Sequence, residues 1–210
     1  MAARAGVSQT VYSRIERGHV APAKVSTLAK VASALGAELV LDLRYRGGRV
    51  DRLIDHAHAS IVEYVLRQLK QAGWEAVVEF SFNVFGERGS VDVLGWHAPT
   101  RTLLIVEVKS RLMDLQELLL SLGRKLRLVP DAVRRDLGWD AAFVGRILVV
   151  PGSSETRTIL ARHRSIFDSS LPVSTTELRR WIRAPNGPIA GVWLVSREVL
   201  VEGRGRVASR

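Results

Sequence analysis

The feature that most constrains the fold is the succession of apolar patterns that follows the Gly47-Gly48 pair. Apolar residues first recur with helical spacing over residues 50–72, and three strand-like runs follow at 74–84, 90–97 and 102–109. A long helix is predicted over 113–129, ended by Pro130, and a short basic helix over 131–137 precedes an apolar strand at 143–150. This order, α-β-β-β-α-β, predicts an α/β domain with a mixed sheet.

The length of the chain allows one substantial domain and a small one. It has 210 residues, and a domain takes roughly 100–200 residues. We expect a small helical domain over residues 1–46, in which 39–45 alternate like a half-buried strand, and the α/β domain over 49–200. Further helices are predicted over 155–164 and 175–183, and a last strand over 189–195. Residues 201–210 are expected to be a loose basic tail.

Several classes of protein are excluded by what the sequence lacks. There is no cysteine, which removes disulfides, zinc ribbons and thiol catalysis. No run approaches the roughly 18 apolar residues that a membrane span needs, and the N-terminus has no apolar signal segment. We therefore expect a soluble, cytoplasmic protein with no membrane partner. His56 and His58 are two apart on a predicted helix, so they diverge and make a poor metal pair.

The balance of charge favours an anionic partner. The formal net charge is +10, and an excess of positive charge attracts polyanions such as nucleic acids. An unspecialised basic surface explains the charge alone equally well. Of the 31 basic residues only five are lysines, so a lysine at a chemically demanding position is less expected by chance. The five are Lys24, Lys30, Lys70, Lys109 and Lys125.

The first 36 residues have the pattern of short helices joined by a tight turn. Ser8 is a plausible N-cap for a helix that runs to residue 17, and Tyr12 and Ile15 would anchor that helix to a core. Pro22 is predicted to open the next helix. The string AARAGVSQTVYSRIERG resembles the second and third helices of Cro/C1-type (XRE-like) DNA-binding domains, and PAKVSTLAKVASALG resembles their fourth.

This resemblance implies DNA as a partner, read in the major groove. The residues that it assigns to DNA binding are Ser8, Gln9, Thr10, Val11, Ser13, Arg14 and Arg17. The chain departs from the family at Tyr12, where Ile or Leu is usual, and the family's first helix would precede residue 1. The alternative is an ordinary helical hairpin without DNA contact. Many such readers are dimers, so a homodimer paired through residues 39–45 is possible.

A second pattern, GSVDVLGWHAPTRTLLIVEVKS, places acidic residues near the ends of two predicted strands. Glu107 and Lys109 are two apart on a strand, so both point to the same face, and an antiparallel partner can bring Asp92 beside them. Two carboxylates can hold Mg²⁺ or Mn²⁺ through hard oxygen ligands, and the Val108 carbonyl is a further candidate ligand. Lys109 could stabilise developing negative charge.

This segment resembles the PD-(D/E)xK nuclease superfamily, which has the restriction-endonuclease-like fold. The resemblance implies metal-dependent hydrolysis of phosphodiester bonds, with Asp92, Glu107 and Lys109 at the centre and Glu63 as an extra acidic ligand on the preceding helix. Glu79, Glu87, Arg88 and Gln116 are weaker candidates near the site. Basic residues that could line a DNA channel are Arg111, Arg124, Lys125 and Arg127.

Three other interpretations of the same residues stay open. The pair Glu107 and Lys109 could be a solvated strand end, or the fold could be retained without its chemistry. In the second case the chain is an XRE-like transcriptional regulator whose other domain serves as scaffold, dimerisation surface or sensor. A nuclease directed at RNA would use the same site, and only the helix-turn-helix argues for DNA.

Overall fold

The computed structural model describes residues 1–20, 23–37, 39, 50–196 and 198. The chain divides into two compact units, Met1–Arg46 and Gly47–Arg210. The strand predicted over 39–45 and the tail over 201–210 lie outside the described residues, as does Pro22.

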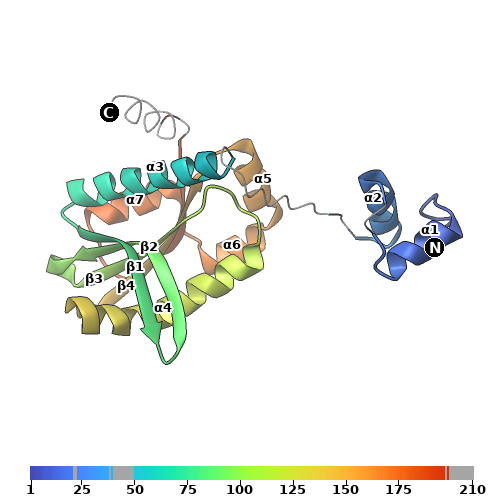
Figure 1. The fold of residues 1–210 in the computed structure, drawn as a ribbon. Helices are drawn as coiled ribbons and strands as arrows, with labels where there is room; N and C mark the ends of the chain where they lie inside the picture. Colours follow the sequence, from blue (N-terminus) through green and yellow to red (C-terminus); the bar gives the residue numbers. More distant parts are fainter. Residues whose placement is uncertain (21–22, 38, 40–49, 197, 199–210) are drawn as a thin grey trace. The chain divides into compact units, whose positions relative to one another are not determined.

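The N-terminal unit contains two helices, α1 (Gln9–Glu16) and α2 (Val25–Ala34) (Figure 1). α1 begins where the Ser8 side chain accepts a hydrogen bond from the Val11 amide at 3.4 Å, as expected of an N-cap. Residues 2–5 form a turn. The core of this unit consists of small side chains around one aromatic ring: Ala2, Ala5, Tyr12, Val31 and Ala34.

The second unit is built on a sheet of five strands within the described residues, in the spatial order β1-β2-β3-β4-β5. β1 (Glu75–Val84), β2 (Glu87–His97) and β3 (Thr102–Val108) pair antiparallel. β4 (Phe143–Pro151) and β5 (Ala190–Val195) extend the sheet in parallel. All seven residues of β3 are buried, because a central strand is covered on both faces. The predicted mixed α/β fold is confirmed.

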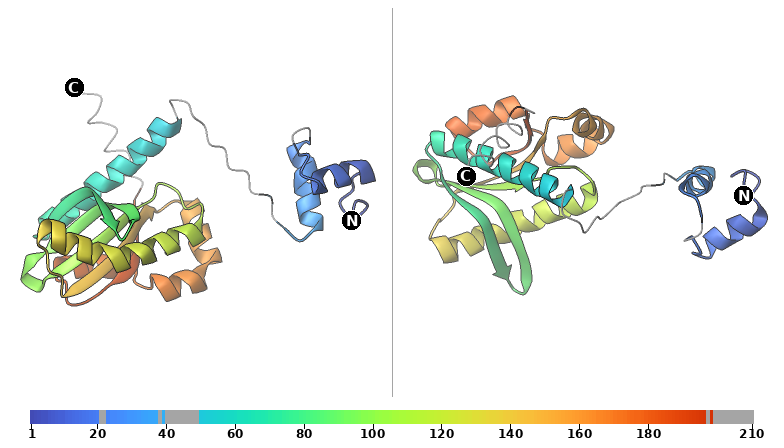
Figure 2. Two further views of the ribbon diagram at one scale, coloured as in Figure 1. Left: turned by 60° about the horizontal axis from the view of Figure 1, so that its bottom comes forward. Right: turned by 45° about the horizontal axis from the view of Figure 1, so that its top comes forward.

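Helices cover both faces of this sheet (Figure 2). α3 (Val50–Gln71) and α7 (Thr175–Arg183) lie side by side on one face, and α4 (Leu115–Leu137) lies on the other. α5 (Ser154–Arg162), α6 (Arg164–Ser170) and a short 3-10 turn, η1 (Ala98–Thr100), complete the unit. One layer of the core packs Ile61, Val65 and Leu69 of α3 under Val93, Leu104 and Val106. The other packs Leu128, Val129 and Val133 of α4 under Phe80 and Ile105.

The structure corrects two of the predicted boundaries. Pro130 does not end the helix but lies inside α4, which continues to Leu137. A proline removes one backbone hydrogen bond, at about 3 kcal/mol or more in a helix interior. Burial of Val129, Ala132 and Val133 on either side of Pro130 offsets this, since all three are fully enclosed.

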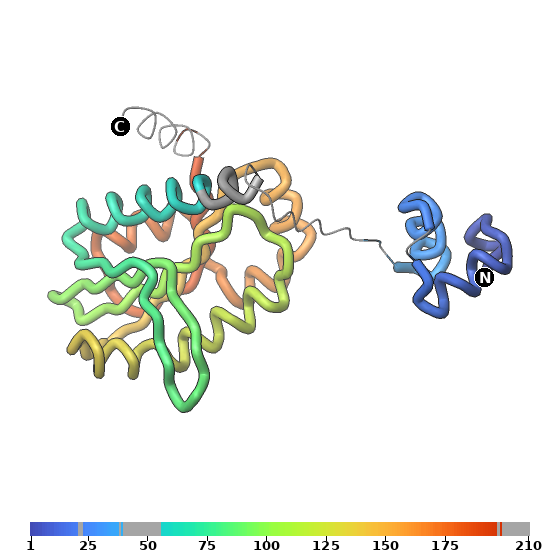
Figure 3. Tube along the Cα trace, in the orientation of Figure 1, coloured from blue at the N-terminus to red at the C-terminus, as the bar shows by residue number. Residues whose placement is uncertain are grey.

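The second correction concerns the turn between β1 and β2. The predicted loop over residues 85–89 shrinks to Phe85 and Gly86, both with positive φ (51° and 83°). This is the left-handed pair that closes a two-residue hairpin, so β2 begins at Glu87, three residues earlier than expected, while β1 ends at Val84 as expected. Figure 3 shows the hairpin extending past α4.

Candidate functional site

The middle of β2 and the end of β3 bring Asp92 and Glu107 together. The ladder between these strands ends at the pair Val93 and Val106, so Asp92 and Glu107 occupy the next opposed positions. No further ladder pair forms there. Instead Asp92 Oδ2 accepts a hydrogen bond from the Val108 amide at 2.6 Å. The carboxylate thus occupies the place where the β2 backbone would have continued the sheet.

The backbone of β1 also changes where β2 reaches Asp92. Ladder pairs join Val78 to Val93 and Phe80 to Val91, but the intervening Glu79 has a left-handed φ of 53°. This conformation costs a non-glycine residue about 1–2 kcal/mol. Glu79 itself is exposed, and the structure does not place it beside the two carboxylates. Asp92 therefore has no ladder partner among the described residues of β1 or β3, although its side chain accepts the hydrogen bond from Val108.

Glu107 is a buried carboxylate held by two lysines. It is 4 % exposed, and its Oε1 accepts a hydrogen bond from Lys109 Nζ at 2.6 Å. Its Oε2 accepts one from Lys125 Nζ, which is buried as well. The Lys109 side chain is 41 % exposed, so this lysine connects the buried carboxylate to the surface. Paired charges of this kind satisfy a buried acid that would otherwise be strongly disfavoured.

Lys125 was assigned to a DNA channel by its charge, whereas the structure places it on α4 against Glu107. A sequence signal for this did exist. Leu118, Leu122, Lys125 and Val129 follow one another at helical spacing along the buried stripe of α4. A lysine within an apolar stripe has to find a buried partner, and the nearest acid in the core is Glu107.

The surroundings of Asp92 raise its pKa above the ordinary value. Burial is the largest cause, and the negative charge of Glu107 adds to it. The hydrogen bond from Val108 and the charges of His58 and Lys109 act in the opposite direction. Two carboxylates that repel each other in a buried place are the arrangement that a cation would relieve.

His58 is a contact that the sequence did not predict. Its Nε2 lies 3.8 Å from Asp92 Oδ1, so α3 contributes a histidine to the cluster. His56 turns elsewhere, with Nδ1 3.3 Å from the Ser60 hydroxyl, as expected for residues two apart on a helix. The spacing of the two histidines excludes a metal site formed by both of them. It does not show that one of them contacts an acid on another element, here Asp92 of β2.

Glu63 lies elsewhere on α3. It is five residues from His58, about 140° around the helix, and it accepts a hydrogen bond from Arg67 at 2.8 Å. The structure thus offers His58 in the position for which Glu63 was proposed. Two of the channel residues are paired with acids, since Arg111 contacts Glu155 at 3.1 Å and Arg127 contacts Glu87 at 2.9 Å. Arg124 Nε is buried without a hydrogen-bond partner among the described residues.

Two pockets flank Lys109. One, of about 360 Å³, is lined by Glu107, Lys109, Arg111 and residues of the following loop and α4. The other, of about 240 Å³, is lined by His58, Val108 and Lys109 among others. Glu107 and Lys109 therefore adjoin open space into which a substrate group can enter, whereas Asp92 lines neither pocket.

The cluster suits a hard divalent cation in its chemistry. Mg²⁺ is commonly held by one or two carboxylates, with water and substrate oxygens completing its shell. Asp92 and Glu107 supply two such groups. Within the part of the chain that the structure describes, no group of three or more His, Cys, Asp or Glu side chains is arranged to hold a metal. A cation here would depend on the two carboxylates and on ligands from outside the chain.

In the N-terminal unit, α1 presents polar side chains outward while Tyr12 is buried. Gln9, Thr10, Arg14 and Arg17 are exposed, and Val11 and Ser13 are half-buried. Amide and guanidinium groups on one exposed helix are the donors and acceptors that read base edges in the major groove.

The comparisons with known proteins bear on the two units differently. Residues 1–41 match the family model HTH_3, a helix-turn-helix, so the N-terminal unit is a helix-turn-helix of the DNA-binding kind. No curated protein matches the chain. A crystal structure of AF1548, a protein of unknown function, is similar at 13% identity over 71% of this chain and 67% of that chain, with a TM-score of 0.33. Among the described residues, no helix has the length and apolar character to cross a membrane.

Proposed function

We propose that the chain binds DNA through its helix-turn-helix and hydrolyses phosphodiester bonds at the Asp92–Glu107 cluster with the help of Mg²⁺ or Mn²⁺. The observation that supports this most is the buried Glu107 beside Asp92, with Lys109 bonded to Glu107 and lining the same open pocket. A structural ion pair would not need a second acid beside it, whose pKa is raised by its own burial and by the charge of Glu107.

Asp92 and Glu107 would hold the cation, and the Val108 carbonyl is the further ligand that we propose. When bound, such a cation polarises a phosphate oxygen and lowers the pKa of a coordinated water. The residues of the chain supply the rest. The Val108 amide fixes one oxygen of Asp92, and Lys125 fixes one oxygen of Glu107. Lys109, half in solvent, is placed to neutralise negative charge that develops on the phosphate.

A second function is favoured by one observation: both oxygens of Glu107 are already satisfied by lysines. A carboxylate whose two oxygens both have partners needs no metal ion, which fits a regulator whose second domain is a scaffold. Such a protein binds its DNA site and cuts nothing, with or without a divalent metal.

Cleavage of labelled substrates separates the two functions. Duplex, branched and single-stranded DNA and single-stranded RNA are each incubated with the full chain in Mn²⁺ or in EDTA. We expect Mn²⁺-dependent cutting that falls about 10²-fold or more in Lys109→Ala, the range for losing one charge-stabilising group. Lys70→Ala removes an exposed lysine of α3 and serves as the control.

Binding without cleavage in every substrate and metal would refute the nuclease and support the regulator. Preferential cutting of RNA would keep the site and change the substrate. Equal activity in Lys109→Ala and Lys70→Ala would assign any cutting to another site or to a contaminant.

A further inference from the structure

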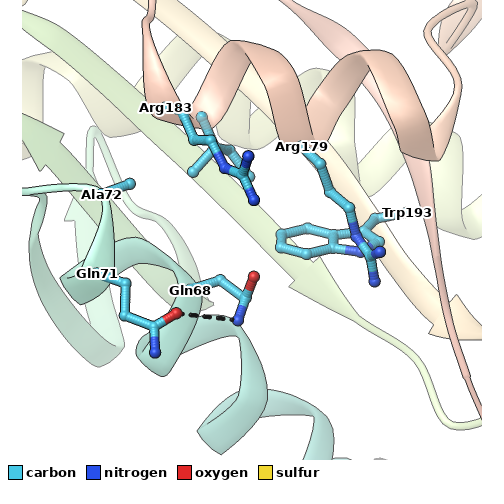
Figure 4. A pocket seen from close by; sticks show the side chains of 7 residues that line it. Gln68, Gln71, Ala72, Arg179, Arg183 and Trp193 are labelled. Carbon is cyan, nitrogen blue, oxygen red and sulfur yellow. Dashed lines mark hydrogen bonds between the residues drawn. The ribbon is translucent and has the colours of Figure 1, made fainter.

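A further pocket lies between α3 and α7. It has a volume of about 320 Å³ and is lined by Gln68, Gln71, Ala72, Arg179, Ile182, Arg183 and Trp193. Figure 4 shows Arg179 and Arg183 reaching in from α7 and Gln68 and Gln71 from α3. None of the residues proposed for catalysis lines it.

The two arginines give this pocket a positive charge that the described residues do not neutralise. Neither Arg179 nor Arg183 forms an ion pair with an acid among them, whereas Arg101, Arg111 and Arg127 each do. The remaining polar groups are the Gln68 and Gln71 amides, which bond to each other at 3.4 Å. Guanidinium and amide N–H donors around a cavity select an acceptor-rich anion.

Arg179 is held in position before any ligand arrives. Its Nη2 donates to the Tyr64 hydroxyl at 2.7 Å, and its guanidinium lies 5.9 Å from the centre of the Trp193 ring. Tyr64 packs edge-on against the same ring at 5.7 Å. A fixed guanidinium binds an anion with less loss of side-chain freedom than a mobile one.

An independent observation points to a missing acceptor. Trp193 is 1 % exposed, and its indole Nε1 is buried with no hydrogen-bond partner among the described residues. Buried donors are nearly always satisfied, and an exception commonly marks the place of a water or an ion. Among the described residues Trp193 is one of three with such a donor, and it lines the arginine pocket, whereas Arg124 and Trp181 do not.

We infer that the α3–α7 pocket is a phosphate-binding site, with Arg179 and Arg183 as its cationic ligands. That the phosphate belongs to a nucleic-acid strand, rather than to a free nucleotide, rests on the proposed function. Trp193 is paired with Val149, which is paired with Val108 beside Glu107. Two strand spacings, about 10 Å, separate these backbones.

The test is binding without catalysis, in EDTA, so that it does not depend on the metal site. A fluorescein-labelled single-stranded 12-mer is titrated against the full chain carrying Gln9→Ala and Arg14→Ala, which disable the reading helix. Into this background we place Arg183→Gln, Arg179→Gln and, as the matched control, Arg180→Gln. Arg180 lies on the same helix and is exposed but does not line the pocket.

We expect about a tenfold weaker affinity in Arg183→Gln and Arg179→Gln and less than a twofold change in Arg180→Gln. The slope of log K against log salt should fall by about 0.7 for each phosphate that the variant no longer neutralises. Arg179→Gln also removes the hydrogen bond to Tyr64, so its melting temperature is measured. If it fails to fold, Arg183→Gln carries the test.

A second arm titrates inorganic phosphate and a nucleoside monophosphate in the same variants. Displacement of the 12-mer by these small anions, lost in Arg183→Gln, would also support the phosphate site. If they bind and the 12-mer does not, the source is a free phosphate ester. Equal losses in all three arginine variants, or none, would overturn the site, whatever the cleavage assay shows.

Discussion

Replacing Lys125 by methionine tests whether Glu107 depends on its buried partner. The two side chains are 7 % and 5 % exposed, so the substitution leaves a carboxylate in the core without one of its two cations. Removing one partner of a buried pair costs about 3–5 kcal/mol. Because Lys109 still holds the other oxygen, we expect the lower end, about 3 kcal/mol.

The assay is urea or thermal unfolding followed by tryptophan fluorescence. All five tryptophans lie in the second unit, at 74, 96, 139, 181 and 193, so the signal reports this unit alone. For a domain of this size, 3 kcal/mol lowers the melting temperature by about 6–12 °C. Lys70→Met, an exposed lysine replaced in the same way, should change it little.

The double variant Glu107→Gln with Lys125→Met removes both charges and should be more stable than Lys125→Met alone. Together with the single variant Glu107→Gln and the wild type, the two variants complete the cycle that measures the coupling between the two side chains. Glu107 does not depend on Lys125 if the free energy of unfolding of Lys125→Met lies within about 0.5 kcal/mol of the wild-type value. The same conclusion follows if the double variant is no more stable than Lys125→Met.

Two further predictions concern the frame of the site. A Cβ at Gly191 would collide with the Val173 carbonyl oxygen, so Gly191→Ala should lower the free energy of unfolding by about 3 kcal/mol. Gly123 lies on α4 with open space around it, so Gly123→Ala should raise the free energy of unfolding by about 0.5–1 kcal/mol. Chemical unfolding of both variants measures these changes, and equal effects would contradict the packing. Hydrogen bonds from the Ser174 hydroxyl and amide lower the pKa of Glu177 below its ordinary 4.5, so this carboxylate stabilises the fold above that pH and loses its contribution as the pH falls through the lowered pKa. The stability difference between wild type and Glu177→Gln should therefore shrink in acid, and a constant or growing difference would disprove the capping role.

The elements that could be predicted from the sequence are those whose apolar pattern reflects their own burial. β3 is apolar from Leu103 to Val106 and again at Val108, with Glu107 between them, and it is buried throughout. α7 begins and ends as predicted, because Leu178, Trp181 and Ile182 form one buried stripe after a Ser174–Glu177 capping box. α6 was not predicted, since it depends on Phe167 packing against distant residues of α4 and β4.

The carboxylate pair could also be placed from the sequence, because opposed positions on antiparallel strands follow from the register. The groups around it could not. Lys125 and His58 come from helices on opposite faces of the sheet, and which residue of a helix faces a strand end depends on how the helix is rotated. Glu63 was proposed from resemblance, and five residues of helix separate it from His58.

Binding of Mn²⁺ by the full chain tests most directly whether Asp92 and Glu107 form a metal centre. Mn²⁺ is titrated by calorimetry or followed by its electron spin resonance, with wild type and Asp92→Asn compared at neutral pH. We expect the wild type to bind Mn²⁺ and Asp92→Asn, which lacks the Asp92 charge, not to bind it. The melting temperature of Asp92→Asn should stay near that of the wild type. Absence of Mn²⁺ binding, or binding that Asp92→Asn leaves unchanged, would contradict a metal centre at Asp92 and Glu107.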